Sequence, residues 1–167
     1  LPADRRRRIA LETREIYAPL AHRFGMAGIK AELEDLAFKF LEPEEYRGLA
    51  DQLAARRAER EQMIRTLRIP LESELRRANV PDFEVTGRPK HLWSIATKMK
   101  KRGTPLEQIY DMMAVRVIVP SVPECYHVLG IIHHRWTPLQ ERFKDYIASP
   151  KSNGYQSLHT AIVGPGR

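Results

Sequence analysis

The chain has 167 residues, a formal net charge of +7 and one cysteine, Cys125. No apolar run approaches the ~20 residues of a membrane helix, and one cysteine cannot form an internal disulfide, so a membrane span and a disulfide scaffold are excluded. The length is sufficient for a small domain with a helical segment attached. We expect a cytoplasmic protein and, because the chain begins at Leu1 and not at a methionine, a part of a longer one.

The positive charge is concentrated in the second half of the chain. Residues 1–80 hold 16 Lys/Arg against 14 Asp/Glu, and residues 81–167 hold 12 against 7. A charge-mixed first half is typical of solvated helices. The excess of cations after residue 80 predicts an anionic ligand or partner there.

Residues 5–80 are predicted to be helical, because apolar residues recur at helical spacing. The first helix contains Ile9, Ile16, Leu20 and Phe24, and Gly25 is placed to end it. A second precedes Pro43. A third is predicted from Pro43 to about Leu67, with a kink or break at Pro70.

Strand patterns begin after residue 81. Strands are predicted over residues 83–87, 112–119 and 155–163, and helices over 90–101 and 122–135. The run 112–119 is apolar at successive positions, which predicts a central strand buried on both faces. Strands alternating with helices indicate an α+β or α/β sheet domain.

The helix predicted from Lys90 carries two different faces. Lys90, Ser94 and Lys98 fall on one side, and Leu92, Ile95, Ala96 and Met99 fall on the opposite side, toward the predicted sheet. Because the free N–H groups of a helix N-terminus favour anions, the first side is a candidate phosphate site. The alternative is an ordinary amphipathic helix with a lysine-rich exposed face.

Asp111 stands where the most apolar strand begins. A carboxylate beside such a run costs desolvation unless it is paired or binds a metal. Carboxylates at a sheet edge are frequent Mg²⁺ ligands in phosphoryl-type transfer. Capping by an aspartate is an equally good interpretation of this position.

The segment 150–160 concentrates polar and aromatic groups. If it is a strand from Tyr155, then Tyr155, Ser157 and His159 share one face, because side chains alternate along a strand. An aromatic plane flanked by donors suits a nucleobase, a sugar hydroxyl and a phosphate. The alternative is a hairpin strand with a polar outer face.

Four motifs in this order resemble those of the long Rel/SpoT alarmone synthetases. They are the segments 87–91 (GRPKH), 109–117 (IYDMMAVRV), 142–148 (RFKDYIA) and 150–160 (PKSNGYQSLHT). Residues 12–21 also resemble the helical segment that precedes the synthetase domain in that family. The resemblance covers nearly the whole chain.

The resemblance implies a nucleotidyltransferase-like mixed sheet and a (p)ppGpp synthetase of the stringent response. Such an enzyme transfers pyrophosphate from ATP to the 3′-hydroxyl of GDP or GTP and releases AMP. Asp111 would be catalytic and would bind Mg²⁺, Arg88 would stack on adenine, and Tyr155 would stack on guanine. The donor phosphates would be held by Lys90, Ser94 and Lys98. The remaining implied substrate-binding residues are Arg142, Lys144, Lys151, Asn153, Gln156 and His159.

The resemblance also implies how the chain is organised. Residues 1–80 would be a helical linker, and residues 81–167 would be a synthetase domain truncated at its C-terminus. The basic motif Arg142–Asp145 resembles that of members that both make and hydrolyse the alarmone, which implies a hydrolase domain before Leu1. The family's second catalytic carboxylate would lie beyond Arg167, so we expect this chain alone to be inactive.

Two alternatives belong to other functional classes. One is a non-catalytic nucleic-acid-binding module, supported by the basic second half and by Tyr155. The other is a regulatory nucleotide-binding segment that does not turn over its ligand. Contact with a ribosome would require domains outside this chain, and no membrane partner is expected.

Overall fold

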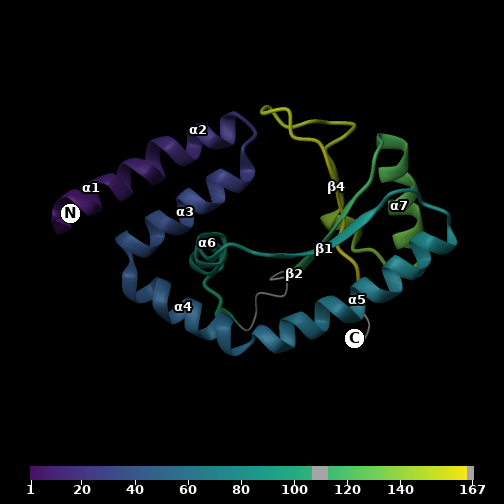
Figure 1. The fold of residues 1–167 in the computed structure, drawn as a ribbon, viewed down its shortest axis with the longest axis horizontal. Helices are drawn as coiled ribbons and strands as arrows, with labels where there is room; N and C mark the ends of the chain where they lie inside the picture. Colours follow the sequence, from purple (N-terminus) through teal and green to yellow (C-terminus); the bar gives the residue numbers. More distant parts are fainter. Residues whose placement is uncertain (107–112, 165–167) are drawn as a thin grey trace. The chain divides into compact units, whose positions relative to one another are not determined.

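The computed structural model describes residues 1–106 and 113–164, apart from the side chains of residues 88, 89 and 113. The chain forms two compact units, and each of them is made of two separate stretches of the chain. The first comprises residues 1–58 and 89–112, and the second comprises residues 59–88 and 113–167. Helices dominate the described residues, and two small two-stranded sheets accompany them, which confirms the α+β class (Figure 1).

The first helical stretch of the first unit is continuous through a widened turn. Helix α1 (Ala3–Glu12) leads through a π-helical turn, η1 (Thr13–Tyr17), into α2 (Ala18–Arg23). Pro19 has no N–H to donate to the Glu15 carbonyl, and its ring would crowd that oxygen, so a wider turn is favoured before it. The predicted stop is confirmed at Gly25, which has a φ of +74°.

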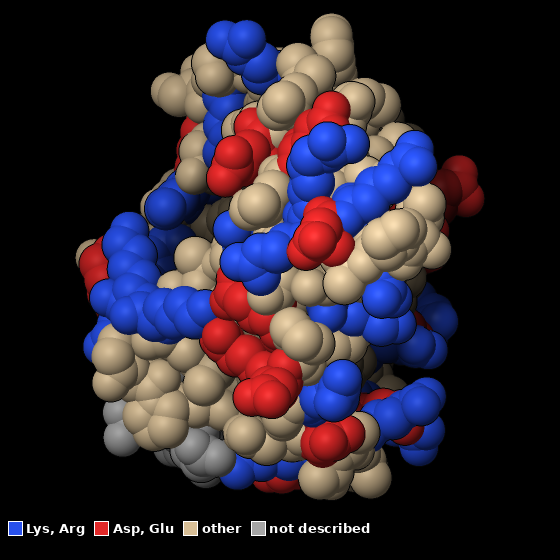
Figure 2. All heavy atoms as spheres, turned by 90° about the vertical axis from the view of Figure 1, so that its left-hand side faces the viewer, with Lys and Arg blue, Asp and Glu red and all other residues tan. Residues whose placement is uncertain are grey.

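Small residues form the packed side of this stretch. Ala10, Ala18 and Ala21 are buried, whereas Ile16 and Phe24, which revealed the helical period, are 51% and 72% exposed. The periodicity therefore predicted the helix correctly but did not identify its buried side. Lys and Arg alternate with Asp and Glu over this part of the surface (Figure 2), as the balanced charge of residues 1–80 predicted.

Helices α3 (Ala27–Leu41) and α4 (Pro43–Ala55) complete the helical layer of the first unit. Phe38 of α3 is fully buried, and its ring lies 5.7 Å from the ring of Tyr46 and 5.3 Å from that of Trp93, measured between centroids. Leu49 and Leu53 of α4 join the same cluster. This cluster is the core of the unit.

Of the kink or break predicted at Pro70, no break occurs. The helix that begins at Pro43 ends at Ala55, and α5 (Arg57–Arg77) continues through Pro70. Leu71 and Leu75 beyond the proline are 3% and 0% exposed, so their burial offsets the hydrogen bond that proline cannot make. The actual break, at Arg56, falls close to the point where the chain leaves the first unit.

Helix α6 (Leu92–Arg102) returns to the first unit. Ile95 and Ala96 are buried against Phe38, Leu49 and Leu53, so the apolar side of α6 packs on α3 and α4, where the sequence predicted a sheet (Figure 1). The helix ends at Gly103, whose φ of +62° suits a residue without a side chain.

The second unit surrounds a small sheet. Strands β1 (Glu84–Pro89) and β2 (Met113–Ile118) pair, and α7 (Val122–Arg135) begins and ends where the sequence predicted. Leu71 and Leu75 of α5, Val85 of β1 and Val128 of α7 form its core with Trp136.

Strand β2 is not buried on both faces. Val115 and Val117 pack on the core, whereas the alternate residues Ala114, Arg116 and Ile118 are exposed. In the described part of the chain its sheet has two strands, so β2 is not a central strand either. The prediction of a fully buried strand is corrected because short apolar runs carry no clear periodicity.

The last segment is more irregular than the predicted strand 155–163. Strands β3 (Lys144–Asp145) and β4 (Leu158–His159) pair antiparallel, and an isolated bridge joins Pro138 to Ile162. A short 3-10 helix, η3 (Gln140–Arg142), precedes β3. In the ranges that the structure describes, no helix combines the length and apolar character needed to cross a membrane.

Candidate functional site

The loop between β3 and β4 is shaped by local hydrogen bonds. The Tyr155 N–H donates to Asn153 Oδ1 at 3.2 Å, and the Gly154 N–H donates to the Lys151 carbonyl at 2.8 Å. Gly154 has a φ of +76°, which few other residues adopt without strain. The sequence Lys151–Tyr155 therefore folds back on itself and presents Tyr155 beside β4.

Three aromatic rings and one ammonium group meet at this loop. Tyr155 Oη lies 3.0 Å from His159 Nε2. The Tyr146 ring lies edge-to-face on both, with centroids 5.3 Å from His159 and 6.1 Å from Tyr155. Lys151 Nζ lies 4.6 Å from the centroid of Tyr146 and 5.3 Å from that of Tyr155. We call Tyr146, Lys151, Tyr155 and His159 the aromatic cluster.

The sequence placed Tyr155 and His159 on one face of a strand from Tyr155, but that strand does not form and the two residues meet in another way. Only Leu158 and His159 form a strand here, and a loop, not strand alternation, carries Tyr155 to His159. Lys144 pairs with His159 across the β3–β4 ladder, so these two side chains leave the same face of the sheet. A second cation is thereby placed next to the cluster.

Asp145 ties the loop to helix α7. Its Oδ1 accepts the N–H groups of Ile147 and Ala148 at 2.9 and 2.8 Å, and its Oδ2 accepts the Tyr126 hydroxyl at 2.9 Å. The hydrogen bond from the Ala148 N–H, with those from the other two donors, lowers the pKa of Asp145. The hydrogen bond between Tyr126 and Asp145 raises the pKa of Tyr126. The carboxylate is engaged in holding the turn that carries Tyr146.

The other predicted residues of this unit are more open. Arg142 in η3 and Gln156 are exposed, and Asn153 acts on the loop backbone. Ser157, which the sequence placed on the face of Tyr155, is half-buried, and its hydroxyl lies 3.4 Å from the Leu158 carbonyl. Arg142 and Gln156 are accessible to a ligand.

The predicted donor residues belong to the first unit. Ser94 and Lys98 are one helical turn apart on α6, and both are half-buried. Lys90 precedes the helix, which begins at Leu92 and not at Lys90 as predicted. The sequence suggested that the first N–H groups of this helix are free to bind a phosphate. The Leu92 and Trp93 N–H groups instead donate to the carboxylate of Asp35 from α3.

Two of the predicted residues lie outside what the structure describes. Asp111 is not among the described residues, and the side chain of Arg88 is not described. In residues 1–106 and 113–164 no group of three or more His, Cys, Asp or Glu side chains could hold a metal ion. Mg²⁺ accepts one carboxylate together with phosphate and water oxygens, so the prediction that Asp111 binds it does not require such a group.

Sequence reasoning missed two residues. Tyr146 lies in the motif 142–148 but was not named as a site residue, although an aromatic residue two positions after Lys144 was a usable signal. Asp35 lies 57 residues before Leu92, in helix α3, and no local pattern could have linked the two.

The fold and the chemistry of the aromatic cluster are those of an α+β protein that can bind a nucleotide. The chain is an α+β protein whose second unit presents stackable rings, a ring nitrogen and lysines on one loop, groups that can bind a nucleotide. Residues 87–167 match the family model described as "Region found in RelA / SpoT proteins".

Proteins similar over almost the whole chain point to the same family. The chain is 48% identical over 166 residues to a "GTP pyrophosphokinase" of Streptomyces coelicolor, covering 99% of the chain and 20% of that protein. It is 48% identical over 165 residues to the "Bifunctional (p)ppGpp synthase/hydrolase SpoT" of Escherichia coli K12, covering 99% and 23%. A "Probable guanosine-3′,5′-bis(diphosphate) 3′-pyrophosphohydrolase" of Synechocystis is 46% identical over 98% of the chain and 22% of that protein.

Residues 87–167 are a RelA/SpoT family region, and nearly the whole chain is homologous to proteins of that family. It spans about a fifth of the length of the curated relatives it matches.

Proposed function

We propose that this chain is the catalytic part of a (p)ppGpp synthetase that transfers pyrophosphate from ATP to the 3′-hydroxyl of GDP or GTP. Homology over nearly the whole chain to a GTP pyrophosphokinase and to a bifunctional synthase/hydrolase supports the reaction. The observation that carries the proposal is the aromatic cluster, in which Tyr155 and His159 lie 3.0 Å apart within the matched region. Both nucleotides are abundant in the cytoplasm, where we place the protein.

In this proposal residues 81–167 form the synthetase domain, with a nucleotidyltransferase-like sheet, and residues 1–80 form a helical linker. The family region at residues 87–167 supports the boundary. The basic motif Arg142–Asp145 and the 48% identity to a bifunctional relative support a place in a protein that also hydrolyses the alarmone.

The acceptor nucleotide is bound by the aromatic cluster and its neighbours. Tyr155 stacks on guanine, and Lys144 and Lys151 lie where they can neutralise the phosphates. Arg142, Asn153, Gln156 and His159 complete the acceptor set. Because Lys151 Nζ lies 5.3 Å from the Tyr155 ring, a stacked base shares that cation or displaces it toward the phosphates.

The donor nucleotide is bound by residues on and before α6. Lys90, Ser94 and Lys98 hold the ATP phosphates, and Arg88 stacks on adenine. Asp111 holds Mg²⁺, which, when bound, neutralises charge on the transferring phosphates. Asp111 also accepts the proton of the 3′-hydroxyl, which attacks the β-phosphorus while AMP leaves.

The proposal is tested by exchanging segments. The part of Escherichia coli SpoT that aligns with this chain, 165 residues, is replaced by this chain's own residues. The purified chimera is given ATP and GDP, and guanosine carrying a 3′-pyrophosphate is sought by chromatography, with unmodified SpoT as the control. A chimera without product, beside an active control, contradicts the proposal. The 167-residue chain assayed alone should give no product.

Replacing Tyr155 with Ala should weaken GDP binding about tenfold or more, because stacking of a base on an aromatic ring is worth ~1–3 kcal/mol. Tyr155→Phe should have a mild effect, since it keeps the ring and loses only the contact with His159. Titration calorimetry of the 167-residue chain measures both. Equal affinities for wild type and Tyr155→Ala would remove Tyr155 from the acceptor site. Strong binding of single-stranded RNA with a steep salt dependence would favour the nucleic-acid alternative.

Replacing Lys98 with Ala should weaken binding of a non-hydrolysable ATP analogue about tenfold or more, because a charge-assisted hydrogen bond contributes ~1.5–3 kcal/mol. Lys100 is unsuitable as the control, because it pairs with Glu42 and Glu45. The matched control is Lys39→Ala, an exposed lysine of α3. Equal losses in the two variants would show a general charge effect and not a phosphate contact.

A further inference from the structure

Helix α6 contacts α3 and α4 at three places along its length. Its middle is buried, with Ile95 and Ala96 at 0% and 1% exposure. Its N-terminal end contacts Asp35 of α3, and its C-terminal half carries Lys100, which reaches Glu42 and Glu45. Polar contacts therefore fix both ends of a helix whose centre is already held by packing.

Asp35 caps α6 from a different helix. Its Oδ1 accepts the Trp93 N–H at 2.8 Å, and its Oδ2 accepts the Leu92 N–H at 3.3 Å. The same Oδ2 lies 3.3 Å from Nδ1 of His91, the N-cap residue, whose own side chain does not cap the helix. The first amides of a helix have no partner within it, and a carboxylate is favoured there by the helix dipole. Asp35 therefore fixes the direction in which the chain enters α6.

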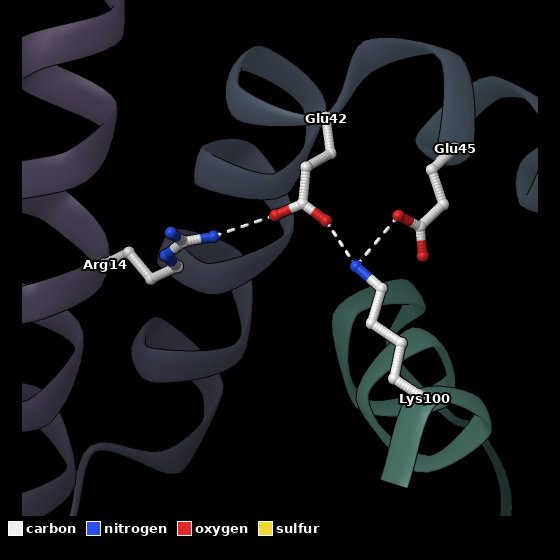
Figure 3. A network of polar contacts seen from close by, with 4 residues as sticks. All are labelled: Arg14, Glu42, Glu45 and Lys100. Atoms are coloured by element: carbon white, nitrogen blue, oxygen red, sulfur yellow. Dashed lines mark hydrogen bonds and ion pairs between the residues drawn. The ribbon is translucent and has the colours of Figure 1, made fainter. Parts of the chain in front are cut away.

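The opposite end is held by a four-residue network of polar contacts (Figure 3). Lys100 of α6 bonds Glu42, at the junction of α3 and α4, and lies 2.8 Å from Glu45 of α4. Arg14 of η1 donates to the other oxygen of Glu42 at 3.0 Å. The hydrogen bond from Lys100 leads the causes that lower the pKa of Glu42. Each side chain of the network points to a partner on another element.

The backbone that Asp35 caps is the segment that carries the donor residues. Lys90 lies one residue before the N-cap His91, and Ser94 lies one residue after the capped amide of Trp93. Lys98 follows one turn later. A change of entry angle or a fraying of the first turn would displace the first two of these side chains directly. The Lys100 contacts would limit rotation of the remainder.

We propose that Asp35 is a positioning residue of the donor site. By accepting the Leu92 and Trp93 amides it holds the first turn of α6, and thereby Lys90 and Ser94, in the arrangement that receives the phosphates of ATP. The inference rests on the proposed function. Asp35 itself contacts no substrate, because its two oxygens are used by the helix and by His91.

The experiment compares two ligands in one set of variants of the 167-residue chain. Affinities for a non-hydrolysable ATP analogue and for GDP are measured by calorimetry in wild type, Asp35→Ala, Asp35→Asn and Asp51→Ala. Asp51 is an exposed aspartate of α4 and serves as the control for lost charge. Lys98→Ala reports on the proposed function itself. Exchange of the Leu92 and Trp93 amide protons, followed by NMR, reports on the cap without any ligand.

Asp35→Ala should bind the ATP analogue about tenfold more weakly, as expected for loss of a helix cap, with GDP affinity unchanged within twofold. The acceptor residues lie in the other unit, so they should not respond. Asp35→Asn should recover part of the affinity, because its amide oxygen can still accept the Trp93 N–H. The two amides should exchange faster in Asp35→Ala and stay protected in Asp51→Ala.

Four results would overturn the inference. If Lys98→Ala weakens binding of the ATP analogue but Asp35→Ala does not, the proposed function stands and the positioning role of Asp35 is wrong. If Asp35→Ala weakens the binding of the ATP analogue and of GDP equally, Asp35 has a structural role only. The same holds if Asp35→Ala is unfolded while Asp35→Asn binds both ligands with wild-type affinity. If wild type binds neither nucleotide, the proposed function and the inference fall together.

Discussion

Replacing Asp111 with Asn in the chimera with Escherichia coli SpoT should lower the rate of product formation at least ~100-fold. The change removes one negative charge and a proton acceptor while it keeps the shape of the side chain. Metal-assisted stabilisation of charge in phosphoryl-type transfer is worth several kcal/mol, and each ~1.4 kcal/mol is a factor of ten in rate. Product is quantified by chromatography after timed reactions at saturating ATP and GDP.

Two controls make the Asp111 result specific. Asp51→Asn changes an exposed aspartate of α4 and should leave the rate unchanged. GDP affinity should be the same in the Asp111→Asn variant and its parent, because in the proposed site the aromatic cluster, and not Asp111, binds the acceptor. Full activity of Asp111→Asn would exclude this residue from catalysis and would favour its interpretation as a cap.

Replacing Phe38 with Ala should lower the free energy of unfolding of the first unit by ~3–5 kcal/mol. The Phe38 ring is fully buried between the rings of Tyr46 and Trp93, so its removal leaves a cavity between α3, α4 and α6. Urea unfolding followed by circular dichroism measures the change as a shift of the midpoint. Since Trp93 is part of this core, its fluorescence gives a second probe of the same transition.

The matched control for Phe38 is two residues away on the same helix. Phe40 is 49% exposed, so Phe40→Ala should change the free energy of unfolding by no more than ~0.5 kcal/mol. Equal losses for the two variants would mean that α3 packs with a different side inward. That outcome would also remove the support that α3 gives to α6.

Helix positions were largely predictable from local patterns. The stop at Gly25, the helix before Pro43 and the bounds of α7 follow from turn-forming residues and apolar periodicity, which act within a few residues. The effect of Pro70 was not predictable in this way. Burial of Leu71 and Leu75 in the core of the second unit decides that α5 continues, and that burial depends on residues up to Val128 and Trp136.

The site was predictable to the same extent. The residue types of the motifs 87–91 and 150–160 suggested Lys90 as a phosphate contact, and Tyr155 and His159 as groups suited to a base and a phosphate. Strand alternation predicted only a shared face for Tyr155 and His159, and their contact arises because the chain turns at Gly154. Tyr146 enters the cluster through the pairing of β3 with β4, which is a contact between segments.

The sequence by itself determined the helical first half, the α+β class, the family and the residue types of the proposed nucleotide sites. These depend on local periodicity, on turn residues and on short motifs, which a single chain displays directly. Only the tertiary structure decided that α6 packs on α3 and α4 and that Asp35 accepts the N-terminal amides of α6. The same holds for the ion pairs of Lys100 with Glu42 and Glu45. The polar contacts among them join residues more than 50 positions apart. Packing that fits many side chains at once selects such contacts, and no local pattern records it.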